Sequence, residues 1–182
     1  MLCIGIYQKS SNDLAKVLCS ALSACDFDII FCGNRLIDIP NNDKNIPVAV
    51  IAGKNLDFVN TPADICIIES GYDGTIRLPS ASIAVVPECC DIEKVNALEP
   101  KSVVSYGLCC KNTVTVSSLI DSSLVISVQR EIVTLSGTRI VEQEFSVEIR
   151  STDRVDAVLA VVSALLIADV PIEQIKQIQF YN

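Results

Sequence analysis

The first residues that could do chemistry are Lys9, Ser10 and Ser11, which follow an apolar segment containing Gly5. A strand, a tight loop and a helix in this order are typical of phosphate-binding loops, in which backbone amides surround the phosphates and a lysine reaches them. Such loops need a second glycine just before the Lys-Ser pair, and residues 6–8 contain none. Gly5, Lys9, Ser10 and Ser11 are candidate ligand contacts of an incomplete phosphate-binding loop. Helix capping is the simpler interpretation of the two serines.

A second group of candidates follows the apolar segment 64–68 and consists of Glu69, Ser70 and Asp73. Ligands of open parallel sheets collect at the carboxyl ends of the strands, so Glu69 is a candidate ligand contact and the candidate metal ligand. A solvated carboxylate at a strand end is the alternative. The stretch Gly71–Gly74 either presents Asp73 to a cleft or forms a turn, and its composition favours the turn.

The chain contains no histidine. This excludes Ser-His-Asp and Cys-His catalysis and removes the usual general base near neutral pH. The sequence does contain nine cysteines, at positions 3, 19, 25, 32, 66, 89, 90, 109 and 110. Several lie in apolar segments, so we expect small buried side chains in a reducing compartment. The adjacent pairs lack the two-residue gap that structural zinc prefers, and a redox role would require an exposed, acidic thiol.

Strand and helix patterns alternate in the first half of the chain. We expect strands at 2–7, 28–32, 48–52, 64–69, 82–86 and 102–106, and helices at 11–25 and 91–98. Pro40–Pro47 reads as a polar loop. Short apolar strands joined by crossovers predict a parallel sheet that is covered on both faces.

The pattern changes after Gly107. Short β-branched segments at 113–118, 124–128, 131–135 and 138–149, with a turn signal at Gly137, predict an antiparallel meander. Helices at 152–168 and 171–177 should close the chain. The economical interpretation is one domain over 1–182, made of a parallel α/β part (1–107), antiparallel strands (108–150) and C-terminal helices (151–182).

Five stretches, taken in order, resemble the central ATP-binding domain of the Mur ligases. The opening strand, loop and helix correspond to its phosphate loop, and 64–70 looks like its strand ending in Glu-x-Ser-Ser. Segment 80–87 looks like its next strand, and 103–107 and 156–175 look like the regions around its adenine-contacting helix. The resemblance implies a three-layer α/β fold, Rossmann-like or P-loop-like, with a mostly parallel sheet, helices on both faces and an antiparallel β-meander toward the C-terminus.

By this resemblance Lys9 and Ser10 would contact phosphate and Mg²⁺, and Glu69 would be the acid that faces the metal. The sequence departs from the family in several places. The metal-site histidine has no counterpart, a segment that carries a modified lysine is missing between Pro87 and Val103, and Asp153 and Asp156 stand where the family tends to have asparagine. Counterparts of the two substrate-binding domains are also missing, although ligation needs ATP, Mg²⁺ and a positioned acceptor.

We therefore expect a degenerate, stand-alone and non-catalytic domain, related to bacterial cell-wall enzymes, that serves as a binding or scaffolding module. It would use no cofactor and would act through self-association or a partner protein. The alternative is a residual nucleotide- or phosphate-ligand-binding enzyme that uses ATP and a divalent metal, Mg²⁺, at Glu69.

The charge of the chain bears on its partners. The net charge is −8, the isoelectric point is about 4.5, and no segment concentrates Lys and Arg. Nucleic acids and anionic membranes need a basic surface, so neither is an expected partner. The N-terminus lacks the basic region of a signal peptide, and the apolar segment 155–170 is too short to span a bilayer. These observations favour a cytoplasmic protein.

Overall fold

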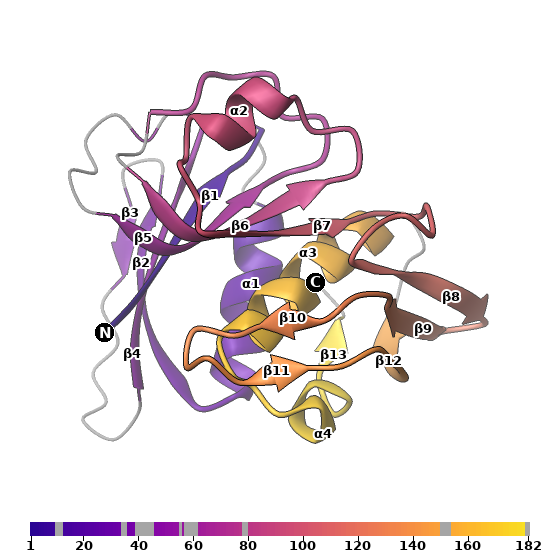
Figure 1. The fold of residues 1–182 in the computed structure, drawn as a ribbon. Coiled ribbons are helices and arrows are strands. Elements are labelled where there is room, and N and C mark those ends of the chain that lie inside the picture. The colour runs from indigo at the N-terminus through magenta and orange to yellow at the C-terminus, as the bar shows by residue number, and fades with distance from the viewer. Residues whose placement is uncertain are drawn as a thin grey trace.

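The structure is a computed structural model that describes residues 1–9, 13–33, 36–38, 46–54, 56, 62–77, 80–149 and 154–180. Eleven strands in this part of the chain form one sheet in the order β13-β12-β9-β8-β7-β6-β5-β1-β4-β2-β3 (Figure 1). Three groups of predicted residues lie outside the described ones: the candidate ligand contacts Ser10 and Ser11, the aspartate Asp153 and most of the loop Pro40–Pro47.

Six parallel strands form the centre of this sheet. They are β7 (Ser102–Tyr106), β6 (Ala81–Pro87), β5 (Ala63–Ile68), β1 (Leu2–Tyr7), β4 (Ile46–Gly53) and β2 (Phe27–Gly33). Their sequences are nearly continuous apolar runs, as expected for strands that are covered on both faces. The predicted α/β fold with a large, mostly parallel sheet is confirmed.

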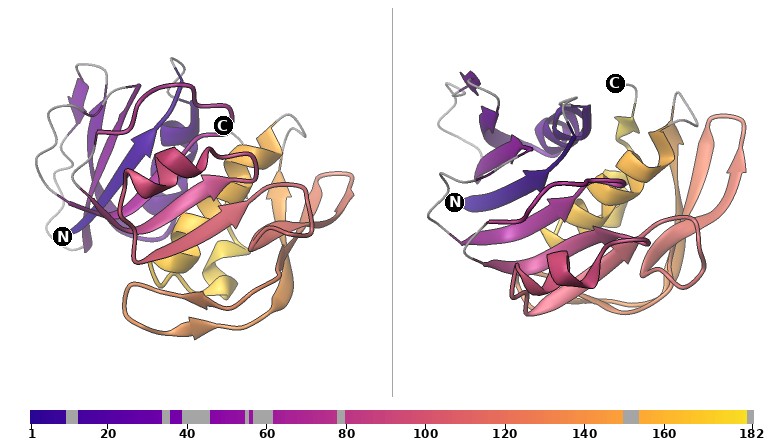
Figure 2. Two further views of the ribbon diagram at one scale, coloured as in Figure 1. Left: turned by 45° about the horizontal axis from the view of Figure 1, so that its top comes forward. Right: turned by 90° about the horizontal axis from the view of Figure 1, so that it is seen from above.

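Helices α1 (Asp13–Ala24) and α3 (Val155–Ile167) cover one face of the sheet, and Figure 2 shows α3 lying along it. Alternate strand residues such as Ile6 and Ile67 point to these helices and join one core with Leu18 and Val162. Ten consecutive residues of α3, from Val158 to Ile167, are buried. The helix is apolar around most of its circumference because it is enclosed by the sheet and α1 within the domain.

The opposite face carries a separate core, built from Tyr7, Cys66 and Ile68 of the strands and Leu98 of the loop after α2. Helix α2 (Ile92–Asn96) contributes Val95, and the Asp91 carboxylate caps it by accepting a hydrogen bond from the Glu93 amide at 3.0 Å. Figure 1 shows α2 above the sheet and α1 and α3 below it. Helices thus lie on both faces, as predicted, but α2 is a single short helix and loops complete that side.

The antiparallel part continues the same sheet. Strand β8 (Val114–Ile120) follows β7 and pairs with β9 (Ser123–Val128), which pairs with β12 (Gln143–Ile149). Between β9 and β12 the chain leaves the sheet and forms a separate hairpin of β10 (Ile132–Val133) and β11 (Arg139–Ile140). The single strand predicted at 138–149 is therefore wrong, because the hairpin turns away to dock on the end of α3.

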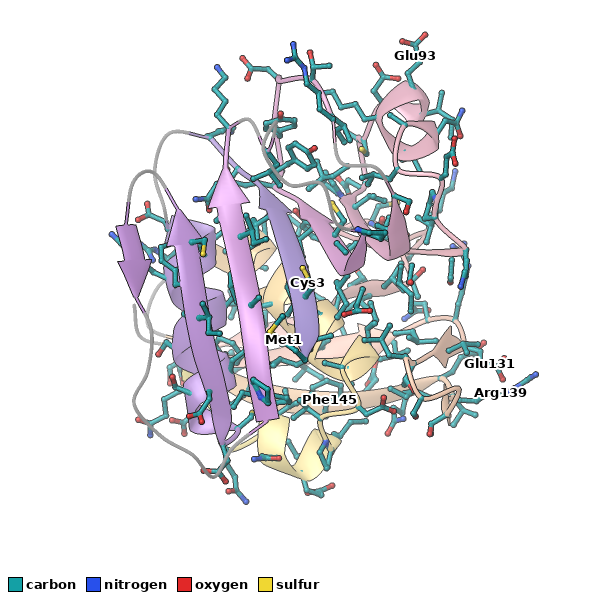
Figure 3. The ribbon with its side chains drawn as sticks, turned by 90° about the vertical axis from the view of Figure 1, so that its left-hand side faces the viewer. Met1, Cys3, Glu93, Glu131, Arg139 and Phe145 are labelled. Carbon is teal, nitrogen blue, oxygen red and sulfur yellow. The ribbon has the colours of Figure 1, made fainter. Side chains whose placement is uncertain are left out.

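A carboxylate at the end of α3 holds this hairpin. Asp169 accepts hydrogen bonds from the Thr134 hydroxyl at 2.5 Å, the Ser136 hydroxyl at 2.6 Å and the Ser136 amide at 3.0 Å. The amide of Leu135 also donates to the carbonyl of Ile167 at 2.9 Å. Glu131 and Arg139 project together from the hairpin, 3.1 Å apart (Figure 3).

Short edge strands and the last helix complete the fold. Strand β3 (Leu36–Asp38) pairs antiparallel with β2, and β13 (Gln179–Phe180) pairs parallel with β12. The sequence patterns had not indicated either strand. Helix α4 (Ile172–Ile175) begins after Pro171, as predicted. No helix among the described residues is long and apolar enough to cross a membrane.

Candidate functional site

Two loops at the carboxyl edge of the sheet are joined through Lys9 and Glu69. Strands β1 and β5 are parallel neighbours whose last residues, Tyr7 and Ile68, are paired, so the residues that follow them lie side by side. The Lys9 amide donates to Oε2 of Glu69 at 2.5 Å across 60 residues of sequence, and the Glu69 amide donates to the Tyr7 carbonyl at 2.8 Å. One carboxylate oxygen of Glu69 is therefore bonded to the amide of the β1 loop.

A cleft of about 390 Å³ opens at this edge. The β1 and β5 loops, the last residue of β7 and the first turns of α1 and α3 form its walls. Its lining residues are Lys9, Asp13, Leu14, Glu69, Ser70, Tyr106, Arg154, Asp156 and Ala157. Lys9, Glu69 and Ser70, which were candidates from the sequence, meet here.

The other described candidates lie elsewhere. Gly5 is buried in the middle of β1, where it pairs with Ile51 of β4 and Cys66 of β5. Asp73 is exposed, and its carboxylate lies 3.6 Å from the ammonium group of Lys54, outside the lining of the cleft. The sequence had grouped Asp73 with Glu69 because only four positions separate them.

The stretch after Glu69 forms the turn that its composition predicted. Gly71 has a φ of +71°, and the Tyr72 amide donates to the Glu69 carbonyl at 3.0 Å. A Cβ atom at Gly71 would lie 2.7 Å from the Lys9 ammonium, so the lysine side chain crosses directly over this turn. Tyr72 points inward, with its ring 5.4 Å from that of Tyr7.

The buried side chain of Gln8 occupies the start of α1. Its Oε1 accepts a hydrogen bond from the amide of Ala15, the third residue of the helix, at 3.2 Å. Amides in a first helical turn have no partner within the helix and are the groups that bind phosphate in many proteins. The Ala15 amide already donates to Gln8 and is therefore not available to a phosphate.

Among the described residues, two cationic and three anionic side chains line the cleft, and their net charge is −1. Asp13 lies 3.9 Å from Arg154 and 3.8 Å from Lys16. Asp13 is therefore paired with cations on both of its carboxylate oxygens. Asp156 stands in the first turn of α3, where the helix dipole favours an acid.

Tyr106 brings a buried phenol to the cleft. Its hydroxyl donates to the Ile68 carbonyl at 2.9 Å, and its side chain is almost fully buried. Burial raises the pKa of this phenol above its usual range, and the nearby Asp156 and Glu69 raise it further. The phenol therefore stays protonated and holds the end of β7 against the end of β5.

No protein-family model matches the chain, and no curated protein matches it. Several solved structures are nevertheless similar. MurF from Acinetobacter baumannii superposes with a TM-score of 0.57 at 14% identity, over 98% of this chain and 46% of MurF. The murein peptide ligase Mpl from Psychrobacter arcticus gives 0.59 at 11%, over 97% of this chain and 46% of that one. The fold of this chain is Mur-ligase-like.

A third similar structure is the UDP-N-acetylmuramate:L-alanyl-gamma-D-glutamyl-meso-diaminopimelate ligase from Neisseria meningitides. It has a TM-score of 0.59 at 13% identity, over 97% of this chain and 65% of that one. At these identities the similarity shows the fold alone. The chain spans less than half of the MurF and Psychrobacter Mpl structures.

Glu88 directly follows strand β6 and forms hydrogen bonds to the loop that follows β7. Its Oε2 accepts hydrogen bonds from the Cys109 amide and from Nδ2 of Asn112, both at 2.9 Å. These bonds lower the pKa of the Glu88 carboxyl. Glu88 therefore ties the loop after β7 to β6, a structural role that the sequence did not indicate.

Glu69, the candidate metal ligand, lies in the cleft with Asp13 and Asp156. Nowhere in the described ranges are three His, Cys, Asp or Glu side chains arranged to hold a metal ion. Within the cleft, Oε2 of Glu69 already accepts the Lys9 amide, and Asp13 is paired with cations. All nine cysteines are free thiols, of which Cys89, Cys109 and Cys110 are exposed.

Proposed function

We propose that this Mur-ligase-like domain is a binding module that does not bind or hydrolyse ATP. The hydrogen bond between the Lys9 amide and the Glu69 carboxylate carries the proposal, because it joins the two groups that a phosphate loop and a metal site would each need free. A triphosphate needs several backbone amides that converge on it. Here the loop lacks the second glycine, and the Ala15 amide already donates a hydrogen bond to the side chain of Gln8.

Electrostatics support the same proposal. The described residues that line the cleft carry a net charge of −1, which disfavours a polyphosphate because like charges in a cleft repel an approaching anion. One of the similar structures is a murein peptide ligase, and another is a UDP-N-acetylmuramate:L-alanyl-gamma-D-glutamyl-meso-diaminopimelate ligase. We therefore place the module beside cell-wall precursor synthesis, where it would act on a partner protein, a second copy of itself or a small ligand.

Isothermal titration of the full chain with ATP and Mg²⁺ tests the proposal, together with a phosphate-release assay. We expect no measurable heat of binding at millimolar ATP and no phosphate release above the buffer rate. Micromolar binding coupled to phosphate release would refute the proposal.

The second candidate is a residual enzyme that binds a nucleotide or phosphate ligand with a divalent ion at Glu69. The observation that favours it is the meeting of Lys9, Glu69 and Ser70 in one cleft. In that case Glu69→Ala should abolish ATP binding while circular dichroism shows an intact fold. Asp73→Ala is the matched control, because Asp73 lies outside the cleft lining. Equal binding by wild type and Glu69→Ala would eliminate this candidate.

A further inference from the structure

A second hollow lies at the other end of α3 from the cleft. It has a volume of about 310 Å³ and lies between the β10–β11 hairpin and the corner where α3 leads into α4. It shares no described lining residue with the cleft, which lies at Asp156 and Ala157 in the first turn of α3. Because α3 has 13 residues with a rise of about 1.5 Å each, the length of the helix separates the two sites.

Apolar side chains form the walls of this hollow, which we call the hairpin groove. They are Ile140, Val141, Leu166, Val170, Pro171 and Ile172. Leu166 and Val170 are buried, whereas 62% of Val141 is exposed to water. An apolar side chain that entered the groove would remove this exposed surface from water, which is the main favourable contribution to most protein association. A volume near the lower end of the roughly 300–1,000 Å³ of ligand sites suits one large side chain.

The polar groups around the groove already have partners within the chain. The Thr134 hydroxyl donates to Asp169 at 2.5 Å, and Nε2 of Gln143 donates to a main-chain carbonyl at 3.1 Å. The Glu173 carboxylate lies 2.8 Å from the ammonium group of Lys176. These described groups form a polar rim around an apolar centre, which is the arrangement of interfaces that anchor one large side chain of a partner.

Both walls of the groove are held by the fold before any partner binds. The hairpin is fixed to the end of α3 by the Asp169 carboxylate and by the hydrogen bond from the Leu135 amide to the Ile167 carbonyl. The opposite wall includes Pro171, directly after which α4 begins. A preformed site loses little conformational entropy on binding, and this favours even a small contact.

The charge around the groove indicates which partner fits it. Segments 130–144 and 166–176, which border the groove, contain five acids and three bases, so their net charge is −2. Arg139 is the cation of the described lining, and it projects together with Glu131, its ion-pair partner (Figure 3). A second copy of this chain carries a net charge of −8 and would be repelled. A partner with Lys or Arg beside its apolar side chain is complementary to this surface.

We propose that the hairpin groove docks a basic segment of a partner protein, with one large apolar side chain in the groove and Lys or Arg residues at its rim. Asp169 and Glu173 are the acids of the described rim that would face these cations. This docking site goes beyond the proposed function, because it lies apart from the cleft and does not depend on whether the cleft binds ATP.

The test adds acetyl-Lys-Phe-Lys-amide to the full chain and follows the ¹H–¹⁵N chemical shifts. We expect saturable shifts of the Val141 and Ile172 amides at millimolar peptide, and no shift of Ser70 or Ala157 in the cleft. Acetyl-Lys-Ala-Lys-amide lacks the large side chain and should bind about tenfold more weakly or worse. Acetyl-Glu-Phe-Glu-amide reverses the flanking charges and should also bind about tenfold more weakly.

Variants at exposed positions test the groove without disturbing the core. Val141→Lys removes an apolar wall and repels a basic segment, so it should raise the Kd for acetyl-Lys-Phe-Lys-amide about tenfold. The matched control is Ile120→Lys, at a side chain that is 65% exposed outside the groove lining. Glu173→Gln should raise the Kd about threefold, as expected for one exposed charge, whereas Glu93→Gln on α2 should leave it unchanged.

The outcomes separate this docking site from the proposed function. Absence of saturable shifts, equal binding of the three peptides, or unchanged affinity in Val141→Lys would overturn it. Equal binding of acetyl-phenylalaninamide would identify an uncharged apolar ligand in place of a basic partner and would also overturn it. So would shifts at Val141 and Ile172 that grow with protein concentration alone, because these would identify a second copy as the occupant. Binding of ATP would refute the proposed function and leave the docking site standing.

Discussion

The fully buried side chain of Gln8 accepts a hydrogen bond from the amide of Ala15, in the first turn of α1. The glutamine belongs to the loop that precedes the helix, so it acts as a cap supplied from several residues upstream. A first-turn amide buried without a partner costs free energy, and Gln8 removes that cost at Ala15. The same contact withdraws this amide from any anion.

Replacement of Gln8 should therefore destabilise the fold. Gln8→Met keeps the length of the side chain but leaves the Ala15 amide without this acceptor. We expect the free energy of unfolding to fall by about 1–2 kcal/mol, the usual cost of a lost cap or a buried unpaired donor. Urea unfolding measures it, with Gln177→Met at an exposed position as the control. Equal stability of the two variants would show that the cap contributes nothing.

Much of the parallel sheet could be predicted from the sequence. The strand expected at 102–106 has these bounds in the structure, and so does the strand at 2–7. Both are apolar runs that end where polar residues or a glycine begin, and strands covered on both faces have this composition. The helix at 155–167 was also predictable, because an apolar segment of that length without Gly or Pro usually forms a helix in a protein core.

The elements that could not be predicted from the sequence are short or depend on contacts with distant parts of the chain. Strands β3 and β13 have three and two residues, too few to show alternation. The segment 138–149 reads as one strand by composition, but Asp169 and the Ile167 carbonyl, at the end of α3, hold the hairpin away from the sheet. No local pattern contains that information.

Some residues of the candidate site could likewise be predicted from the sequence, and others could not. Lys9 and Glu69 could be placed together because the ends of parallel strands share one edge of a sheet. Arg154 and Asp156 could not, because the first turn of α3 reaches this edge only through packing against the sheet and α1. Tyr106 also escaped notice, since a tyrosine at the end of an apolar strand looks like core.

The carboxylate of Asp169 should make stability depend on pH in the acid range. Burial alone would raise its pKa, but the hydroxyl groups of Ser136 and Thr134 and the Ser136 amide bond the charged form and hold the pKa below its ordinary value of 3.8. A carboxyl whose pKa is lowered by folding stabilises the folded state above its unfolded pKa. This stabilisation is lost as the pH falls through the folded pKa.

Asp169→Asn is the matching variant, because asparagine tolerates the φ of +62° at this position. At pH 7 the variant should be less stable than wild type by about 1 kcal/mol, a modest value because solvent screens this exposed group. Below pH 3 the difference should shrink toward zero. A difference that stays constant between pH 7 and pH 2.5 would contradict this account of Asp169.

The buried stripe of α3 should dominate stability. Leu165 has no exposed surface and packs in the core between the sheet and α1, so Leu165→Ala removes buried carbons and leaves a cavity. We expect a loss of about 2–5 kcal/mol in the free energy of unfolding, measured with urea. The control Leu108→Ala, at a side chain that is 63% exposed, should change stability by no more than about 0.5 kcal/mol. Similar losses in both variants would mean that α3 is not enclosed.

The nine thiols should separate by reactivity. Cys89, Cys109 and Cys110 are exposed, whereas burial raises the pKa of Cys25 to about 11 and also raises that of Cys66. A disulfide reagent attacked by thiolates should therefore modify the three exposed cysteines first at pH 8, and Cys25 and Cys66 only as the protein unfolds. Mass spectrometry of partly modified protein identifies the sites. Changing the three exposed cysteines to serine should remove the fast phase, and unfolded wild type should titrate all nine. Rapid modification of Cys66 in the native protein would mean that the face of the sheet beneath α2 is open to solvent.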